Sequence, residues 1–490
     1  MNKQIFNLFY CLALIAVLVS CKDDDPVIEY GEAKMTSFGF YAEDNEGKIF
    51  HDYVVTEITG DINLLLPDYT DKTELIARFE ITEDDEVTVG TVAQVSGTTA
   101  NDFSLPVDYI ITEGTNNTKY TVTVSDLPSA VWTQVATYTT ELREYTMKVN
   151  PVSNVPYLAY VVDADEYEDR KAGVLKLDET GLASVGTVIA SEGRAAYPNI
   201  AFNAEGVPYI SYVDYSAAVA QSISVMALNG SSWDYVGAGK GITDVKVTYN
   251  SLLVKADNNP MVLCMNNAAG TLARRELNIS DYNGSAWTTS VAMPGRLATQ
   301  RAYHPRTKVI NGVIYAAIYN ADNGTFSLYK NVEGAWSVIV DGFLDDGATT
   351  AYLRDFDMTV DANGNIYVAL ADDQSGADNY RPKVKKYDVE NSTWSTVGSP
   401  IDVDFASTKE FSLALSTTGV PFFMYKNISK FPEVVYFDNE TQDWTTPVVL
   451  DQVESEDLFI DFGTNGVGYA SYISSNTGAT VVYKFDIPVQ

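Results

Sequence analysis

The stretch from Gly206 to Tyr212, GVPYISY, decides the fold because seven versions of it occur along the chain. Each version is a turn followed by a run of β-prone residues, and consecutive versions lie roughly fifty residues apart. Their aligned anchor positions are Tyr157, Tyr209, Met261, Tyr315, Tyr367, Phe422 and Tyr469. A repeat of this length that holds several strands is typical of a β-propeller.

A second set of landmarks has the same period. Six tryptophans recur, and five of them follow a turn: Trp132, Trp233, Trp287, Trp336, Trp394 and Trp444. Each repeat therefore reads as four antiparallel strands, which predicts a seven-bladed β-propeller over residues 130–490. The last repeat lacks a tryptophan strand, so we expect Val131–Tyr138 to supply its outer strand and close the ring. An array of β-sandwiches with similar spacing is the alternative.

The first twenty residues have the features of a signal peptide. Lys3 is followed by an apolar run, Phe9–Val19, that is too short to anchor a protein across a bilayer. Leu18–Cys21 resembles the lipobox of bacterial lipoproteins, which implies a lipid on Cys21. The acidic stretch that follows, Lys22–Asp25, is similar to the export tag of Bacteroides-group lipoproteins. The resemblance implies an acidic tether over 21–29 and an outer-membrane, outward-facing location; an ordinary secretory signal is the alternative.

Residues 30–128 alternate apolar and polar side chains in short runs, as a β-sandwich does. Ser96–Tyr109 contains the pattern SGxTxxDFxxPVxY, and Tyr120–Val124 reads YTVTV. Both resemble an Ig-like module of Bacteroides-group surface lipoproteins, which implies a spacer more than an activity. We expect Phe103 and Tyr109 to fill its core and Asp102 to cap a turn.

Composition excludes several functions. The formal net charge of −34 argues against nucleic acid as a partner, and against membrane contact other than through the lipid. With Cys21 lipidated, the mature chain has no intramolecular disulfide. His51 and His304 lie in different domains, so a histidine metal site or catalytic triad is not expected. The sequence predicts no metal and no cofactor.

One pattern indicates a binding site. A basic residue stands just before the innermost strand in six repeats: Arg143, Arg194, Lys246, Arg301, Arg354 and Lys409. Aromatic residues lie beside them, and loops 163–171 and 372–381 add Tyr167, Tyr380 and Arg381. Cations at a channel mouth attract carboxylates or sulfates, and aromatic faces stack on sugar rings. The candidate ligand-binding residues are Arg143, Arg194, Tyr197, Lys246, Arg301, His304, Tyr352, Arg354, Tyr380, Arg381 and Lys409.

Three functions remain open at this point. The sequence favours a cell-surface lipoprotein that binds an extracellular acidic glycan or glycoprotein at the channel mouth, without catalysis. A glycoside hydrolase or polysaccharide lyase could use the same face, and a scaffold for an outer-membrane protein partner is the third reading. Alternatively, the cations pair with carboxylates such as Glu144, Asp355 or Glu410 and only hold neighbouring blades together.

Overall fold

The computed structural model describes residues 33–49, 52–67, 70–82, 85–126, 130–237, 240–288, 291–296, 300–343, 356–373, 380–401, 410–439 and 441–486. Within these ranges the regular structure is strand, apart from one short 3-10 turn, η1 (Tyr167–Asp169), so the all-β prediction is confirmed. The chain divides into two compact units, the first comprising Met1–Asn45, Asp52–Leu66 and Thr70–Ser125. The second comprises Glu46–His51, Pro67–Tyr69 and Asp126–Gln490.

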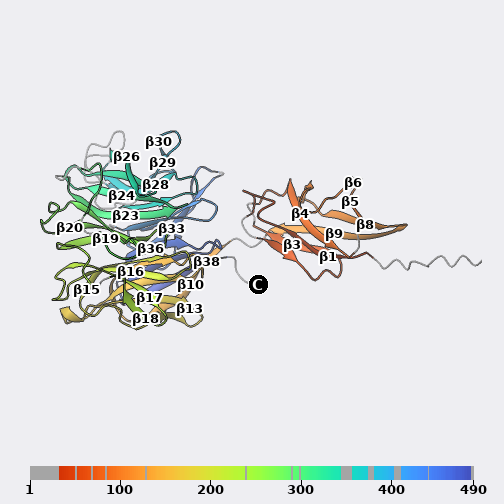
Figure 1. The fold of residues 1–490 in the computed structure, drawn as a ribbon. Helices are drawn as coiled ribbons and strands as arrows, with labels where there is room; N and C mark the ends of the chain where they lie inside the picture. The colour runs from red at the N-terminus through yellow and green to blue at the C-terminus, as the bar shows by residue number, and fades with distance from the viewer. Residues whose placement is uncertain are drawn as a thin grey trace, which may run out of the picture. The chain divides into compact units, whose positions relative to one another are not determined.

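The first unit consists of two β-sheets (Figure 1). One sheet has the order β2 (Tyr53–Val55), β1 (Met35–Phe40), β4 (Leu75–Ile81), β7 (Ala100–Asn101). The other has the order β3 (Ile62–Leu66), β9 (Asn116–Asp126), β8 (Val107–Glu113), β5 (Glu86–Val89), β6 (Val92–Ala93).

Aromatic side chains fill the core of the first unit. Phe38, Phe40, Phe103 and Tyr109 are all less than 2% exposed. Edge-to-face contacts join them, with ring centroids 4.9 Å apart for Phe40–Phe103 and 5.2 Å for Phe38–Tyr109. The Asp102 carboxylate accepts a hydrogen bond from the Ser104 amide at 2.9 Å. The expected core residues and turn cap are therefore confirmed.

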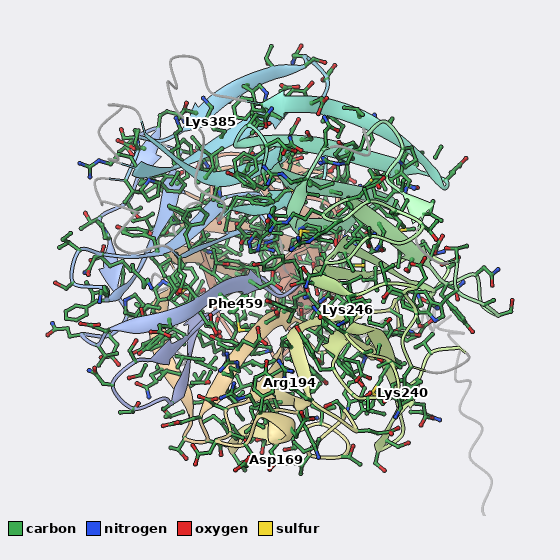
Figure 2. The ribbon with its side chains drawn as sticks, turned by 90° about the vertical axis from the view of Figure 1, so that its left-hand side faces the viewer. Asp169, Arg194, Lys240, Lys246, Lys385 and Phe459 are labelled. Atoms are coloured by element: carbon green, nitrogen blue, oxygen red, sulfur yellow. The ribbon has the colours of Figure 1, made fainter. Side chains whose placement is uncertain are left out.

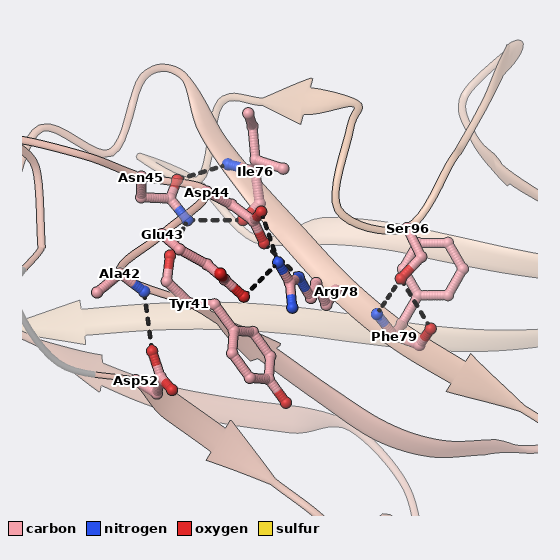
Figure 3. Close-up of polar contacts among 10 residues, drawn as sticks. All are labelled: Tyr41, Ala42, Glu43, Asp44, Asn45, Asp52, Ile76, Arg78, Phe79 and Ser96. Carbon is pink, nitrogen blue, oxygen red and sulfur yellow. Dashed lines mark hydrogen bonds and ion pairs between the residues drawn. The ribbon is translucent and has the colours of Figure 1, made fainter.

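A charged cluster fixes the segment after β1 against β4 (Figure 3). The Arg78 guanidinium binds both oxygens of Asp44, at 2.5 and 2.8 Å, and reaches Glu43 at 2.7 Å. Its carbon Cζ also lies 4.7 Å from the centre of the Tyr41 ring. Arg78 thus makes a bidentate ion pair whose geometry lysine could not reproduce.

The described strands of the second unit form seven antiparallel sheets. The first sheet has the order β11 (Leu142–Val149), β12 (Pro156–Val162), β13 (Ala172–Asp178), β14 (Gly181–Ser184). The second has the order β15 (Ala195–Phe202), β16 (Pro208–Asp214), β17 (Ser222–Asn229), β18 (Ser232–Tyr235). The third has the order β19 (Val247–Val254), β20 (Pro260–Asn266), β21 (Leu277–Asp281), β22 (Val291–Ala292).

The fourth and fifth sheets are β23 (Ala302–Ile310), β24 (Val313–Asn320), β25 (Thr325–Val332), β26 (Ala335–Phe343); and β27 (Asp357–Val360), β28 (Ile366–Asp373), β29 (Tyr380–Asp388), β30 (Thr393–Val397). The sixth contains β31 (Phe411–Leu415), β32 (Pro421–Lys426), β33 (Pro432–Asp438) and β34 (Asp443–Trp444), with β35 (Val448–Val449) paired to β33. The seventh has the order β10 (Val131–Tyr138), β38 (Thr480–Asp486), β37 (Gly468–Ser474), β36 (Ser455–Phe462).

These sheets follow one another around a ring. The first strands contact each other in the order β11, β15, β19, β23, β27, β31, β36, and β36 packs against β11. This is the arrangement of a β-propeller. The ring is completed by β10, which pairs antiparallel with β38 from Val131 opposite Asp486 to Tyr138 opposite Thr480. The seventh sheet thus takes its outer strand from before the first repeat, as the sequence predicts.

Three of the recurring tryptophans connect their sheet to the one before it through a hydrogen bond of the indole. The indole Nε1 of Trp233 donates to the Val185 carbonyl at 2.9 Å, that of Trp287 to Val236 at 2.7 Å, and that of Trp444 to Ser399 at 3.0 Å. Each acceptor lies beside a glycine with positive φ: Gly186, Gly237 or Gly398. The absence of a Cβ there leaves room for the indole, so the Trp and Gly positions form one inter-sheet contact.

Cys264 is a core residue of the second unit. It is fully buried on β20, and its thiol donates to the Asn278 side-chain oxygen at 2.9 Å. Burial raises the pKa of this thiol far above its ordinary value. The described part of the chain contains no helix long and apolar enough to cross a membrane.

Candidate functional site

The first strands of the second unit surround a central cavity of about 270 Å³. Each of the seven sheets contributes one residue of its first strand to the wall, always at the same register position. This residue pairs with the second-strand residue that stands two positions after the repeat anchor. These residues are Thr146, Asn199, Ser251, Arg306, Asp357, Ser412 and Phe459. Because they are mostly polar, the channel can hold water or a polar group.

Charged groups of both signs face this channel. Arg306 lies 3.9 Å from Asp357, and Lys308 lies 3.9 Å from Asp461. Burial, helped by the neighbouring charge of Lys308, lowers the pKa of Lys148 to about 8. These opposite charges offset one another, so the channel wall does not select strongly for one sign of ligand.

Three carboxyl groups lie together near the start of the first strands. Glu144 accepts the Tyr197 amide at 2.9 Å, and Glu410 accepts the Asp457 amide at 2.8 Å. Burial is the main reason that the pKa values of both glutamates are raised. Burial, followed by the charge of Glu410, raises the pKa of Asp457 to about 8. Each glutamate thus links its sheet to the next through a main-chain amide, and Glu410 also lies 3.3 Å from the Lys426 ammonium.

A second cavity, of about 230 Å³, lies between the first two sheets. We call it the arginine pocket. Its lining side chains come from β11, the loop that contains η1, the start of β15 and the end of β16: Arg143, Glu144, Tyr167, Arg170, Arg194, Ala195, Ala196, Tyr197 and Tyr215. It therefore combines three guanidinium groups, three tyrosine rings and one carboxyl group.

Arg194 is held between two aromatic rings in this pocket. Its carbon Cζ lies 3.2 Å from the centre of the Tyr167 ring and 3.9 Å from that of Tyr215, and it donates a hydrogen bond to the Tyr167 hydroxyl. Arg170 lies 5.3 Å from the same Tyr167 ring. Tyr167 itself is 51% exposed, so the stacked arginine stands at the surface where a ligand can reach it.

The other two arginines share an acidic neighbour. Arg143 and Arg170 lie 3.9 and 3.8 Å from the same oxygen of Asp163. Both distances are long for ion pairs, and one carboxylate cannot neutralise two guanidinium groups. Among the described residues Arg194 forms no ion pair with a carboxylate, so the three guanidinium groups outnumber the two nearby carboxyl groups, Glu144 and Asp163.

The strand register shows that the basic residues which the sequence pattern treats as equivalent occupy different positions in their sheets. The main-chain carbonyls of Arg194, Lys246 and Arg301 accept the amides of Tyr215, Asn267 and Ala321, so these three positions are equivalent. In the first and seventh sheets Glu141 and Glu454 make the same bond. Arg143 lies two residues further along, within β11. The described cations thus occupy two different positions and do not form a single ring.

The remaining candidates differ in their surroundings. Arg301 forms an ion pair with Asp322, which supports a structural role for it. Figure 2 shows Arg194 and Lys246 on the same face of the unit, with Lys246 nearer the centre. Tyr380 and Arg381 begin β29, and Arg381 pairs with Asp372 in the strand register. Cys21, Tyr352, Arg354 and Lys409 lie outside the described residues.

Three residues near the site were not predicted. Arg170 reaches the pocket on the loop that contains η1, which the repeat pattern does not signal. Tyr215 directly follows β16, and its amide donates to the Arg194 carbonyl, so its place beside Arg194 comes from the strand pairing that the repeats share. Tyr249 stands twelve residues before its anchor Met261, the same spacing as Tyr197 and Tyr209, so a stricter alignment would have found it. Among the described residues no group of His, Cys, Asp and Glu side chains could hold a metal ion.

Comparison with known proteins gives one family match. Residues 40–124 match the family model described as SGBP, N-terminal, the N-terminal module of surface glycan-binding proteins. The match covers most of the first unit and ends before Asp126, where the main part of the second unit begins. No curated protein matches the chain.

Solved structures resemble the chain only distantly. The polysaccharide lyase Uly1 shares 10% identity over 72% of this chain and 90% of its own, with a TM-score of 0.46. An Aleuria aurantia lectin in complex with Fucalpha1-6GlcNAc shares 12% sequence identity over 60% of this chain and 94% of its own, with a TM-score of 0.40. A Penicillium chrysogenum alpha-L-arabinanase complexed with arabinobiose shares 10% sequence identity over 60% of this chain and 94% of its own, with a TM-score of 0.40. The chain is thus similar over its first unit to the N-terminal module of surface glycan-binding proteins.

Proposed function

We propose that the protein is a cell-surface lipoprotein that binds an acidic glycan in the arginine pocket. The observation that carries this proposal is the pocket's composition: Arg194 stacked between Tyr167 and Tyr215, with Arg143 and Arg170 beside it. Guanidinium groups bind carboxylates and sulfates in a bidentate manner, and tyrosine rings stack on sugar faces. The glycan-binding family of the first unit supports the same assignment.

The proposal includes a cellular location, the outer face of the outer membrane. A lipid on Cys21 would anchor the protein to the outer membrane, facing the exterior, with the first unit as a spacer. Testing it requires labelling whole cells with palmitate and treating them with an external protease. Loss of the label in a Cys21→Ala variant, and digestion of the protein on intact cells, are the expected results.

Ligand binding is tested with residues 27–490. We expect an oligogalacturonate, a chain of negatively charged sugars, to bind in isothermal titration, and a neutral maltooligosaccharide to bind much more weakly. Arg194→Ala should weaken the oligogalacturonate by about tenfold or more. Arg301→Ala is the matched control, because Arg301 occupies the equivalent position but is paired with Asp322. Equal effects of both substitutions, or no glycan binding at all, would overturn the proposal.

A glycoside hydrolase is the second candidate, and one observation favours it. Asp457 has a pKa raised to about 8, so it holds a proton at neutral pH, and Glu410 lies beside it. Such a pair of carboxyl groups can act as acid and base in glycosidic cleavage. Chromatography of the titrated oligosaccharide decides between the two: release of shorter products that stops in Asp457→Asn would favour the enzyme. Unsaturated products would instead indicate a polysaccharide lyase.

A further inference from the structure

An unusual backbone conformation recurs at the start of four first strands, and in three adjacent ones it falls on an aromatic residue. Each of β15, β19 and β23 contains a bulge, where the pairing register shifts. In each bulge an aromatic residue has positive φ: Tyr197 at 52°, Tyr249 at 46° and His304 at 44°. We call these three residues the aromatic ledge.

The conformation is costly for these residue types. A bulky side chain in the left-handed region costs roughly 1–3 kcal/mol, and glycine is the residue that avoids this cost. The chain uses glycine with positive φ in many of its turns, but an aromatic residue at these three bulges. A bulge changes the direction in which a side chain points, so the ledge presents three rings that a regular strand would place elsewhere.

The rings of the ledge form a continuous series. The ring centres of Tyr197 and Tyr249 are 5.1 Å apart, and those of Tyr249 and His304 are 4.1 Å apart. All three side chains are half-buried, so each keeps part of its surface accessible. Tyr197 also lines the arginine pocket, which makes the ledge continuous with it.

Positive charge continues along the same path. Arg275 lies with its Cζ 5.2 Å from the ring of Tyr303, the residue that precedes His304. Lys246 precedes Tyr249 by three residues, as Arg194 precedes Tyr197. Arg194 and Lys246 lie on one face of the unit (Figure 2). Rings and cations therefore extend together from the second sheet to the fourth.

We infer that the aromatic ledge is a set of additional sugar subsites, so that the protein recognises an internal stretch of an acidic polysaccharide, not only one terminal residue. This inference rests on the proposed function of the arginine pocket. One sugar occupies the pocket, and the following sugars stack along Tyr197, Tyr249 and His304 while their acidic groups meet the adjacent cations. Affinity must then increase with chain length until the ledge is covered.

The experiment compares an oligogalacturonate dimer with an octamer by isothermal titration. For the unchanged protein we expect the octamer to bind at least about tenfold more tightly, since each further sugar can stack on another ring of the ledge. Tyr249→Ala should remove most of this difference while leaving dimer affinity unchanged. Tyr436→Ala is the matched control, because Tyr436 is a partly exposed tyrosine on β33 of the sixth sheet.

Each other outcome counts against the inference. If the octamer binds no more tightly than the dimer, the ledge provides no additional subsites, although binding in the arginine pocket would still stand. Equal loss of dimer and octamer affinity in Tyr249→Ala also overturns it, because Tyr249 would then act through the pocket. Absence of binding by both oligomers overturns the proposed function as well. Should Tyr249→Ala melt at a lower temperature than the control, Tyr249→Leu provides the same test with most of the packing volume retained.

Discussion

The central residue of the proposed site is Arg194, whose side chain contributes both a positive charge and a planar guanidinium group. Its carbon Cζ lies within 4 Å of the ring centres of both Tyr167 and Tyr215. A lysine at this position keeps the charge but has neither the planar group nor the bidentate fork. Stacked cations of this kind contribute about 0.5–1 kcal/mol at exposed positions. Shape and charge can therefore be tested independently.

We expect Arg194→Lys to lower oligogalacturonate affinity by about fivefold, consistent with the loss of about 1 kcal/mol. The slope of affinity against salt should stay the same because the charge is retained. Titrations at several salt concentrations check both statements. Arg301→Lys, at the equivalent position, is expected to change neither quantity; wild-type affinity in Arg194→Lys would show that only the charge matters.

Asp457 makes stability depend on pH in a predictable direction. Its pKa is raised from 3.8 to about 8 by burial and by the charges of Glu410, Glu144 and Glu456, although Lys426 acts in the opposite direction. Between these two values the folded protein keeps a proton that the unfolded chain has released. The free energy of unfolding gained from this group is therefore fully present below about pH 4 and is lost as the pH rises through about 8.

Asp457→Asn should remove this dependence, because the amide imitates the protonated acid and asparagine tolerates the φ of 52°. We expect equal melting temperatures for variant and wild type near pH 4. At pH 8 the variant should be more stable by about 1 kcal/mol or more. Thermal unfolding across this range measures the difference. Parallel curves for the two proteins would show that Asp457 is ionised in the folded state.

At the level of elements, the repeat anchors could be predicted but the strand register could not. Tyr157 and its equivalents mark the second strands because apolar residues follow a turn at regular spacing, and burial enforces this pattern. The bulges in the first strands add one or two residues at different points. Counting back from the anchors therefore equates Arg143 with Arg194, whereas the main-chain bonds equate Glu141 with Arg194.

The inter-sheet tryptophan contact gives a prediction at the same scale. A Cβ added to Gly398 would lie 2.5 Å from the Trp444 indole nitrogen, whereas one added to Gly230 would meet no atom within 4 Å. The two glycines have almost the same φ, 62° and 61°. Substitution by alanine therefore imposes the same backbone strain at both sites, of roughly 1–2 kcal/mol.

Gly398→Ala should consequently destabilise the protein more than Gly230→Ala, by about 1–3 kcal/mol. Denaturant unfolding of both variants measures this difference directly. Trp444→Phe in the Gly398→Ala background should recover little stability, because the hydrogen bond to Ser399 is lost in that variant. Equal losses at the two glycines would mean that the indole moves aside at no cost.

For the whole molecule, the net charge opposes the proposed ligand. A protein of charge −34 repels a polyanion at long range, although the arginine pocket attracts it at short range. Salt screens the long-range repulsion first, because the Debye length falls to about 10 Å at 0.1 M. We expect oligogalacturonate affinity to rise from about 0.01 to 0.1 M salt and to fall above that. A steady decrease over the whole range would show that the local field of the pocket dominates at every distance.

Closure of the ring is a property of the whole second unit, and it could be predicted from sequence because one strand was missing at the end and one was unassigned at the start. Positions within the arginine pocket could be predicted only in part, since Arg170 reaches the pocket on a loop that no repeat specifies, whereas Tyr215 meets Arg194 through strand pairing within the second sheet. Strand β10 pairs with β38 along its length, and without it β38 would present unpaired amides and carbonyls.

A fragment of residues 126–490 should therefore melt as a single folded unit, while a fragment of residues 140–490 should melt several degrees lower. The shorter fragment should also associate, because the exposed edge of β38 offers pairing positions to a second chain. Calorimetry and size-exclusion chromatography measure the two effects, and the longer fragment controls for loss of the first unit. If both fragments melt at the same temperature as monomers, then the contacts of β36 with β11 hold the ring closed without β10.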